Sequence, residues 1–269
     1  MSNLVLAKEI RLGSRIVTHL TLNRPTKLNA LDANLQDALV AAVEAAGSQR
    51  DAGAIIISGA GRAFSAGGDL DFLKSCGDKP AASNYATLRA FYGRILSVRQ
   101  SPVPVIAALN GSAVGAGCCL AMASDFRIGP SVDAAAKFGF NFAALGFAPG
   151  IASSHLLPKL VGPTVALRML TLDELLTPAT ALSSGFVDRA APTDPVTSAL
   201  ELADELLASH RNFDSVMAGV QSIRDFLSQG LETALHTEAT VQATALTSDA
   251  MRHGIESIIA KERPVYDSV

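Results

Sequence analysis

The chain has 269 residues, of which 49% are hydrophobic and 17% are charged, and its formal net charge at pH 7 is −3. This balance leaves no basic surface for nucleic acid or for an anionic membrane. The apolar runs, such as residues 103–109, are far too short to cross a bilayer, and the N-terminus lacks the pattern of a secretory signal. We therefore expect a cytoplasmic protein with a large core, built as one domain or as one domain with a small extension.

The cysteine content argues against a disulfide-rich protein and against a zinc-binding protein. Three cysteines are too few for a disulfide framework, and the adjacent pair Cys118 and Cys119 lacks the spacing of zinc ligands. We expect reduced thiols and no bound metal.

The first half of the chain predicts a mixed α/β core. Residues 5–12 and 15–22 alternate around Gly13-Ser14, which predicts a β-hairpin, and Asp32 is the expected N-cap of a helix over 32–46. Further strands are expected over 55–58, 103–109 and 125–128, and further helices over 69–76, 83–100 and 115–123. Such a succession indicates short connections between strands and helices around one core.

After Pro192 the pattern becomes helical. Helices are expected over 196–209, 213–228, 232–248 and 252–261. We place a soft boundary here, between a core of residues 1–197 and a helical region of residues 198–269. The helical region carries more apolar side chains than a small tail can bury, which favours an oligomer: Leu200, Leu206, Leu207, Val216, Val220, Ile223 and Leu227.

Two glycine-rich segments carry the functional signal: residues 61–70 (GRAFSAGGDL) and residues 110–120 (NGSAVGAGCCL). Each follows an apolar run and leads into a predicted helix, so backbone N–H groups are left unpaired at its end. Two such ends side by side form an oxyanion hole, which stabilises charge that develops on a carbonyl oxygen. Each segment taken alone is equally well explained as a tight strand-to-helix connection.

The amino-acid sequence of both segments resembles that of the corresponding segments in the crotonase (enoyl-CoA hydratase/isomerase) superfamily. The resemblance extends in order from about Leu4 to Tyr266 and includes residues 22–31 (LNRPTKLNAL), Phe138-Gly139, Leu145-Gly146, Ala148-Pro149-Gly150 and residues 157–162 (LPKLVG). It implies a spiral of ββα units with a C-terminal helical trimerisation region, in a homotrimer or in a hexamer that is a dimer of trimers. It also implies an acyl-CoA or enoyl-CoA ligand, with coenzyme A as part of that ligand and no separate cofactor.

The resemblance also assigns residues to the ligand. The thioester carbonyl is expected between the backbone N–H groups of Gly68 and Ala116, although glycine is commoner at the second position. Contacts to coenzyme A fall on a set of loop residues: Lys27, Leu28, Ala30, Ser65, Ala66, Asp69 and Leu70. Lys27 either meets a phosphate or is simply solvated, and Asp69 is better explained as a helix N-cap than as a base.

The expected acids are missing. Hydration of an α,β-double bond needs a general base and a general acid, and the hydratases place two glutamates there. The matching positions hold Cys119 and Phe142, and a third position that is acidic in some isomerases and hydrolases holds Gly150.

Other side chains are weak substitutes for these acids. Cys119 is a nucleophile candidate, but a small thiol in an apolar helix is more often packed and inert. His155, Tyr85 and Tyr92 are candidate proton carriers that are more often structural or pocket-lining residues.

Two functional hypotheses remain open, and both belong to lipid and fatty acid metabolism. The first is an enzyme that stabilises a thioester enolate for isomerisation, decarboxylation, thioester hydrolysis or weak hydration, as a lyase or isomerase of this superfamily. The second is a non-catalytic acyl-CoA-binding module. A third reading, a structural subunit without ligand, leaves the glycine segments without a purpose, and fold alone does not decide among them.

Overall fold

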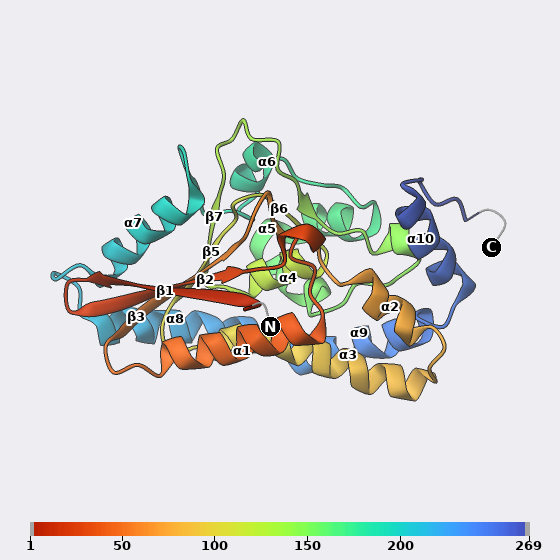
Figure 1. Cartoon of the computed structure of the whole chain (residues 1–269), viewed down its shortest axis with the longest axis horizontal. Helices are drawn as coiled ribbons and strands as arrows, with labels where there is room; N and C mark the ends of the chain where they lie inside the picture. The colour runs from red at the N-terminus through yellow and green to blue at the C-terminus, as the bar shows by residue number, and fades with distance from the viewer. Residues whose placement is uncertain (1–2, 267–269) are drawn as a thin grey trace.

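The computed structural model describes residues 3–266 and shows two sheets surrounded by helices (Figure 1). The larger sheet has the strand order β1 (Val5–Leu12), β2 (Arg15–Leu22), β3 (Ala52–Gly59), β5 (Val105–Ala108), β7 (Phe126–Gly129) and β9 (Arg189–Ala190). The smaller sheet holds β4 (Ala63–Ser65), β6 (Ser112–Val114) and β8 (Phe138–Gly139). β1 and β2 form the predicted antiparallel hairpin, and the remaining neighbours in both sheets are parallel.

The two sheets grow together as the chain advances. Three successive units each add one strand to the larger sheet, one strand to the smaller sheet, and then a helix: β3 and β4 precede α2 (Leu70–Cys76), β5 and β6 precede α4 (Ala116–Ala123), and β7 and β8 precede α5 (Ser153–Thr171). This is the expected spiral of ββα units. Helix starts therefore collect at the edge where the short strands end, which brings the two glycine-rich segments together.

The helices of the first half agree with the predicted order. α1 (Ala33–Gly47) begins after Asp32, whose side chain accepts a hydrogen bond from the N–H of Leu35 at 2.8 Å, as expected of its N-cap. α3 (Ala81–Leu96) continues into a short 3₁₀ helix, η2 (Ser97–Gln100). Two further 3₁₀ turns, η1 (Pro25–Lys27) and η3 (Ala143–Leu145), and the short α6 (Pro178–Ser183) are the remaining helical segments before residue 190.

The larger sheet is covered on both faces. Ile55 and Ile57 of β3 point into the main core, which contains α1, α3 and α4, while Ala54 and Ile56 point to a second apolar cluster. The alternation follows from the pleat, and burial on both faces explains why β3 reads as a continuous apolar run.

The second cluster is closed by α7 (Pro195–Leu207), whose Ala199 and Ala203 are fully buried against the sheet. The expected boundary between residues 197 and 198 falls inside this helix. Packing assigns α7 to the core, and the helices that follow it are α8 (Phe213–Ser228), α9 (Leu231–Ala245) and α10 (Asp249–Ala260).

The last helices cover the opposite side of the core. α9 packs along α3, and α10 packs against η3 and α2, at the end of the molecule opposite α7 (Figure 1). Within the described residues, no helix combines the length and the apolar character that crossing a membrane requires.

Candidate functional site

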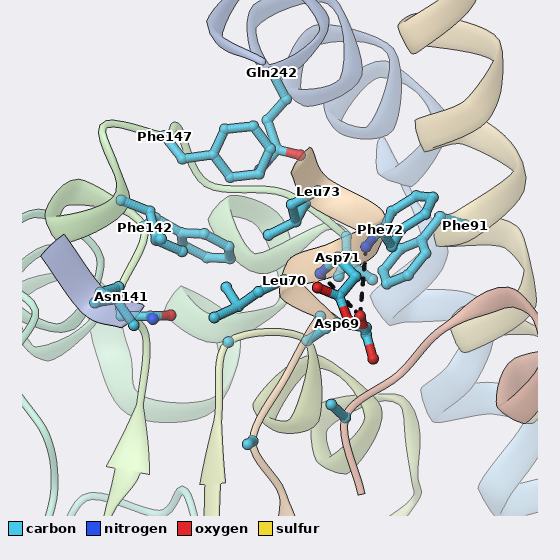
Figure 2. A pocket seen from close by; sticks show the side chains of 18 of the residues that line it. Asp69, Leu70, Asp71, Phe72, Leu73, Phe91, Asn141, Phe142, Phe147 and Gln242 are labelled. Carbon is cyan, nitrogen blue, oxygen red and sulfur yellow. Dashed lines mark hydrogen bonds between the residues drawn. The ribbon is translucent and has the colours of Figure 1, made fainter. Parts of the chain in front are cut away.

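A cavity of about 500 Å³ opens between α2, α3, α4 and the segment that follows β8 (Figure 2). Both glycine-rich segments reach its wall, through Gly68 and through Ala116. α9 and α10 close it from the C-terminal side with Gln242, Ile258 and Ile259. Most other lining side chains are apolar or aromatic, as is typical of small-molecule sites.

The loop before α2 leaves the N–H of Gly68 free. Leu31 pairs with Gly68 in a parallel bridge, in which the N–H of Leu31 donates to the carbonyl of Gly67 at 2.7 Å and the N–H of Asp69 donates to the carbonyl of Leu31 at 3.1 Å. In such a bridge the middle residue turns its own N–H away from the partner. The N–H of Gly68 has no acceptor within residues 3–266.

Ala116 is the first residue of α4, so its N–H has no partner inside the helix. Gly115 precedes it at φ +54°, a conformation that favours glycine, and donates to the carbonyl of Gly139 at 2.9 Å. A Cβ placed on Gly67 would lie 3.4 Å from the nitrogen of Ala116 and only 2.7 Å from the carbonyl oxygen of Val114. The two glycine-rich loops are therefore in direct contact, and glycine at 67 makes that approach possible.

The residues expected to contact coenzyme A divide into two groups. Those that line the cavity are Lys27, Ala30, Ala66, Asp69 and Leu70. The other two, Leu28 and Ser65, do not line it. Ser65 is buried and donates through Oγ to the carbonyl of Asn29 at 2.8 Å, and the carbonyl of Leu28 accepts from the N–H of Ala66 at 2.9 Å.

Asp69 has the role of a helix cap. Its Oδ1 accepts hydrogen bonds from the N–H groups of Asp71 at 3.0 Å and Phe72 at 3.4 Å (Figure 2). Its Oδ2 pairs with Arg24 at 3.2 Å. The exposed Lys27 pairs with Asp71 at 3.2 Å, at the rim of the cavity. Asp69 and Asp71 are the carboxylates among the described residues that line the cavity.

The three positions where acids were expected are neutral, and each is packed differently. Phe142 lines the cavity and stacks on Phe140, with ring centroids 5.3 Å apart. Cys119 is fully buried behind the wall, with its Sγ 3.8 Å from the carbonyl oxygen of Gly150, and burial raises the pKa of its thiol well above the ordinary value. A thiol of this kind remains protonated and unreactive.

Of the three substitute proton carriers, the structure brings one to the cavity. Tyr92 lines it, and the Tyr92 hydroxyl donates to Oε1 of Gln242 while burial raises the pKa of the phenol. His155 lies outside it, where its Nε2 is 2.9 Å from the carbonyl oxygen of Leu227 and joins α5 to α8. Tyr85 is also outside, with its hydroxyl 2.9 Å from Nδ1 of His236.

A family model described as "Enoyl-CoA hydratase/isomerase" matches residues 13–268. The chain belongs to the enoyl-CoA hydratase/isomerase family. It is similar to a probable enoyl-CoA hydratase of Mycobacterium tuberculosis (strain ATCC 25618 / H37Rv), with 37% identity over 215 residues that cover 80% of each chain. It is 30% identical over 267 residues to the 2,3-dehydroadipyl-CoA hydratase of Escherichia coli (strain K12), with 99% of each chain covered.

A solved structure agrees with this assignment. The crystal structure of an enoyl-CoA hydratase/isomerase from Xanthobacter autotrophicus Py2 matches with a TM-score of 0.81 and 28% identity, over 96% of each chain. The ββα spiral and the helical C-terminal region are thus those of the enoyl-CoA hydratase/isomerase fold.

Two polar residues that line the cavity were not predicted from the sequence. Gln242 reaches the cavity from α9 (Figure 2). Asn141, the residue before Phe142, reaches it from the segment that follows β8 (Figure 2). A Cβ on Gly115 would lie 3.3 Å from Oδ1 of Asn141, so this amide stands beside the start of α4. Asn141 could have been proposed as a site residue because it is next to Phe142 in the sequence. No neighbouring residue in the sequence marks Gln242 as a site residue.

Proposed function

We propose that the chain binds an acyl-CoA thioester with its carbonyl oxygen between the N–H groups of Gly68 and Ala116, and that these amides stabilise an enolate. The observation that carries the proposal is a pair of N–H groups, on adjacent loops of one apolar cavity, that have no acceptor among residues 3–266. The name of the Escherichia coli relative specifies a CoA thioester, and we extend that substrate class to this chain.

The proposed chemistry differs from that of an ordinary hydratase. Water addition needs a group that takes a proton from water and a group that protonates the α-carbon. Cys119, Phe142 and Gly150 supply neither, so we expect hydration to be weak or absent. Isomerisation and decarboxylation remain as reaction classes that use the same enolate, and thioester hydrolysis remains as one in which the same two N–H groups would stabilise a tetrahedral oxyanion.

The second candidate function is a non-catalytic acyl-CoA-binding module. The neutral inner wall favours it, because Phe142, Phe147 and Gln242 face the cavity where proton carriers would be needed. Binding under either function uses mainly backbone groups, so both predict affinity for the thioester.

The oxyanion assignment is tested by the pair Ala116→Pro and Ala116→Gly. Proline is well tolerated at the first position of a helix and removes one N–H, whereas glycine keeps it. We expect the carbonyl ¹³C resonance of bound, labelled butyryl-CoA to move downfield in the native protein and in Ala116→Gly. In Ala116→Pro this movement is lost although circular dichroism shows a folded protein. A carbonyl resonance that is unchanged on binding to the native protein contradicts the proposal.

The choice between enzyme and binding module is tested with a panel of acyl-CoA and enoyl-CoA thioesters, measured by both calorimetry and turnover. Turnover of one class identifies the enzyme, and for that reaction the loss of one oxyanion donor in Ala116→Pro should cost about 10²–10³ in rate. Binding of the panel without turnover identifies the module.

A further inference from the structure

Position 150 requires glycine because a neighbouring side chain fills the adjacent space, and not because of its backbone conformation. Gly150 is absent from the glycines with positive φ, so its conformation is open to other residues. A Cβ built on it would nevertheless lie 2.7 Å from both Cδ and Oε1 of Gln242. The amide of Gln242 therefore occupies the space into which a side chain at position 150 would project.

Gln242 is not free to move away. It is 2% exposed, its Oε1 accepts the hydrogen bond of the Tyr92 hydroxyl, and its Nε2 donates to the carbonyl of Ala148 at 2.5 Å. Displacing the amide would leave the buried Tyr92 hydroxyl and the part-buried carbonyl of Ala148 without these partners, which is costly. The contact between Gln242 and Gly150 is thus a fixed feature of the wall.

The helix that carries Gln242 is itself locked to this wall. Glu238, one turn earlier on α9, accepts hydrogen bonds from the N–H of Ala152 at 2.6 Å, the N–H of Ser154 at 2.9 Å and the hydroxyl of Ser154 at 2.6 Å. Between these two attachments lies Ile151, which lines the cavity at φ +59°, a backbone conformation that β-branched residues rarely adopt. α9 therefore holds the turn of residues 148–154 from both sides.

We propose that Gln242 is a specificity-determining residue, whose amide fills the space in front of Gly150 and thereby limits the length of acyl group that the cavity accepts. Figure 2 shows Gln242 entering the cavity beside Phe147, on the side opposite Asp69. Residues 150 and 242 form a coupled pair, because a side chain at one position excludes the long side chain at the other. The inference rests on the proposed function, since it concerns the acyl group of the same ligand.

The volume argument is tested with butyryl-CoA and octanoyl-CoA, whose dissociation constants are measured by calorimetry. Gln242→Ala opens room for several methylenes, and each methylene buried is worth about fourfold in affinity. We expect octanoyl-CoA to gain at least about tenfold over butyryl-CoA in Gln242→Ala, relative to the native ratio. Gln242→Leu keeps the volume and should leave the native ratio within about twofold, as should Val241→Ala on the exposed face of α9. An unchanged ratio in Gln242→Ala, or an equal change in Gln242→Leu, overturns the proposal.

The pairing itself is tested without ligand, by urea denaturation of a double-mutant cycle. Gly150→Ala should lower the urea midpoint of the native chain, because its methyl group meets the fixed amide, and should leave the midpoint of Gln242→Ala unchanged. If Gln242→Ala does not fold, Gln242→Asn provides the shorter side chain in its place. Equal losses in both backgrounds overturn the coupling. If no native acyl-CoA affinity is found, the proposed function has failed, and the cycle still reports on the pair.

Discussion

Arg224 of α8 forms a two-point ion pair with Asp125, the residue before β7, with Nε 2.7 Å from Oδ1 and Nη2 2.6 Å from Oδ2. Both side chains are nearly buried, with 5% of the arginine and 11% of the aspartate exposed. Oδ2 of Asp125 also accepts from the N–H of Val105, the first residue of β5. Arg224 is the buried residue of α8, so this pair fastens the helix to the strands of the core.

We predict that Arg224→Ala lowers the free energy of unfolding by about 3–5 kcal/mol, because it leaves the carboxylate of Asp125 buried and unpaired. Urea denaturation followed by circular dichroism measures the loss. Arg252→Ala is the matched control, since Arg252 is exposed and its pair with Asp249 is worth about 1 kcal/mol at most. Losses of equal size in the two variants would show that the buried pair has no special role.

A second prediction concerns the pH dependence of stability through Glu238. Burial raises the pKa of this carboxyl above its ordinary value, although the hydrogen bonds from Ser154 and Ala152 oppose the shift. The native state therefore holds the proton to higher pH than the unfolded state does. The contribution is fully present below the unfolded pKa and is lost as the pH rises through the higher, folded pKa.

The comparison of the native chain with Glu238→Gln isolates this effect, because glutamine cannot ionise. We expect the stability of the native chain relative to Glu238→Gln to fall as the pH rises from about 4 to 7. Urea denaturation at several pH values measures it, with Glu256→Gln as the exposed control. A stability difference that grows in favour of the native chain as the pH rises has the wrong sign for a raised pKa.

Assembly gives the third prediction. The structure uses some of the apolar residues of the helical region internally, since Leu200, Leu206 and Leu207 pack against the sheet. Ile223 and Phe226 of α8 remain 60% and 56% exposed. Exposed apolar side chains on one helix favour burial against another subunit.

We therefore predict a homotrimer or a hexamer at micromolar concentration, measured by light scattering. Placing a charge in the interface by Ile223→Glu should lower the mass, whereas the same change at the exposed Leu6 of β1 should not. A native chain that is monomeric at this concentration contradicts the prediction.

Local signals explain what could be predicted of the fold. The hairpin at Gly13 and the cap at Asp32 depend on residues that are neighbours in sequence, and both are confirmed. The strands β4, β6 and β8 were not predicted, because they have two or three residues each and are defined by distant partners, such as Ala63 with Ser112 and Ala113 with Phe138. A pattern of alternation needs a longer run than these strands provide.

The same distinction applies to the candidate site. Gly68 and Ala116 could be named because each has a fixed position within a sequence motif, and the structure brings both to one cavity. Gln242 contacts a glycine that lies 92 positions earlier in the chain (242 − 150), so only the packing of α9 onto the wall reveals it. His155 could be named because it follows Gly150 closely in the sequence, but α5 directs its ring toward α8.

The sharpest prediction concerns hydration of crotonyl-CoA. Loss of a general acid or base costs about 10²–10⁴ in rate, and the native chain lacks carboxylates at both Cys119 and Phe142. We expect slow or absent hydration together with retained binding, because the groups proposed to hold the thioester are mainly backbone. A spectrophotometric assay of the enoyl chromophore measures the rate, and calorimetry measures the binding.

Restoring the acids should restore part of the activity. The double variant Cys119→Glu with Phe142→Glu should raise hydration more than the single changes combined, since a proton donor and a proton acceptor act as a unit. Cys119 is fully buried and Phe142 is 5% exposed, so two carboxylates there weaken the fold, and the urea midpoint is measured first. The pair Cys119→Gln with Phe142→Gln is the control, because it has the same shape without ionisable groups. If the native chain hydrates crotonyl-CoA at about 10 s⁻¹, the median for enzymes, another residue of the cavity carries the proton.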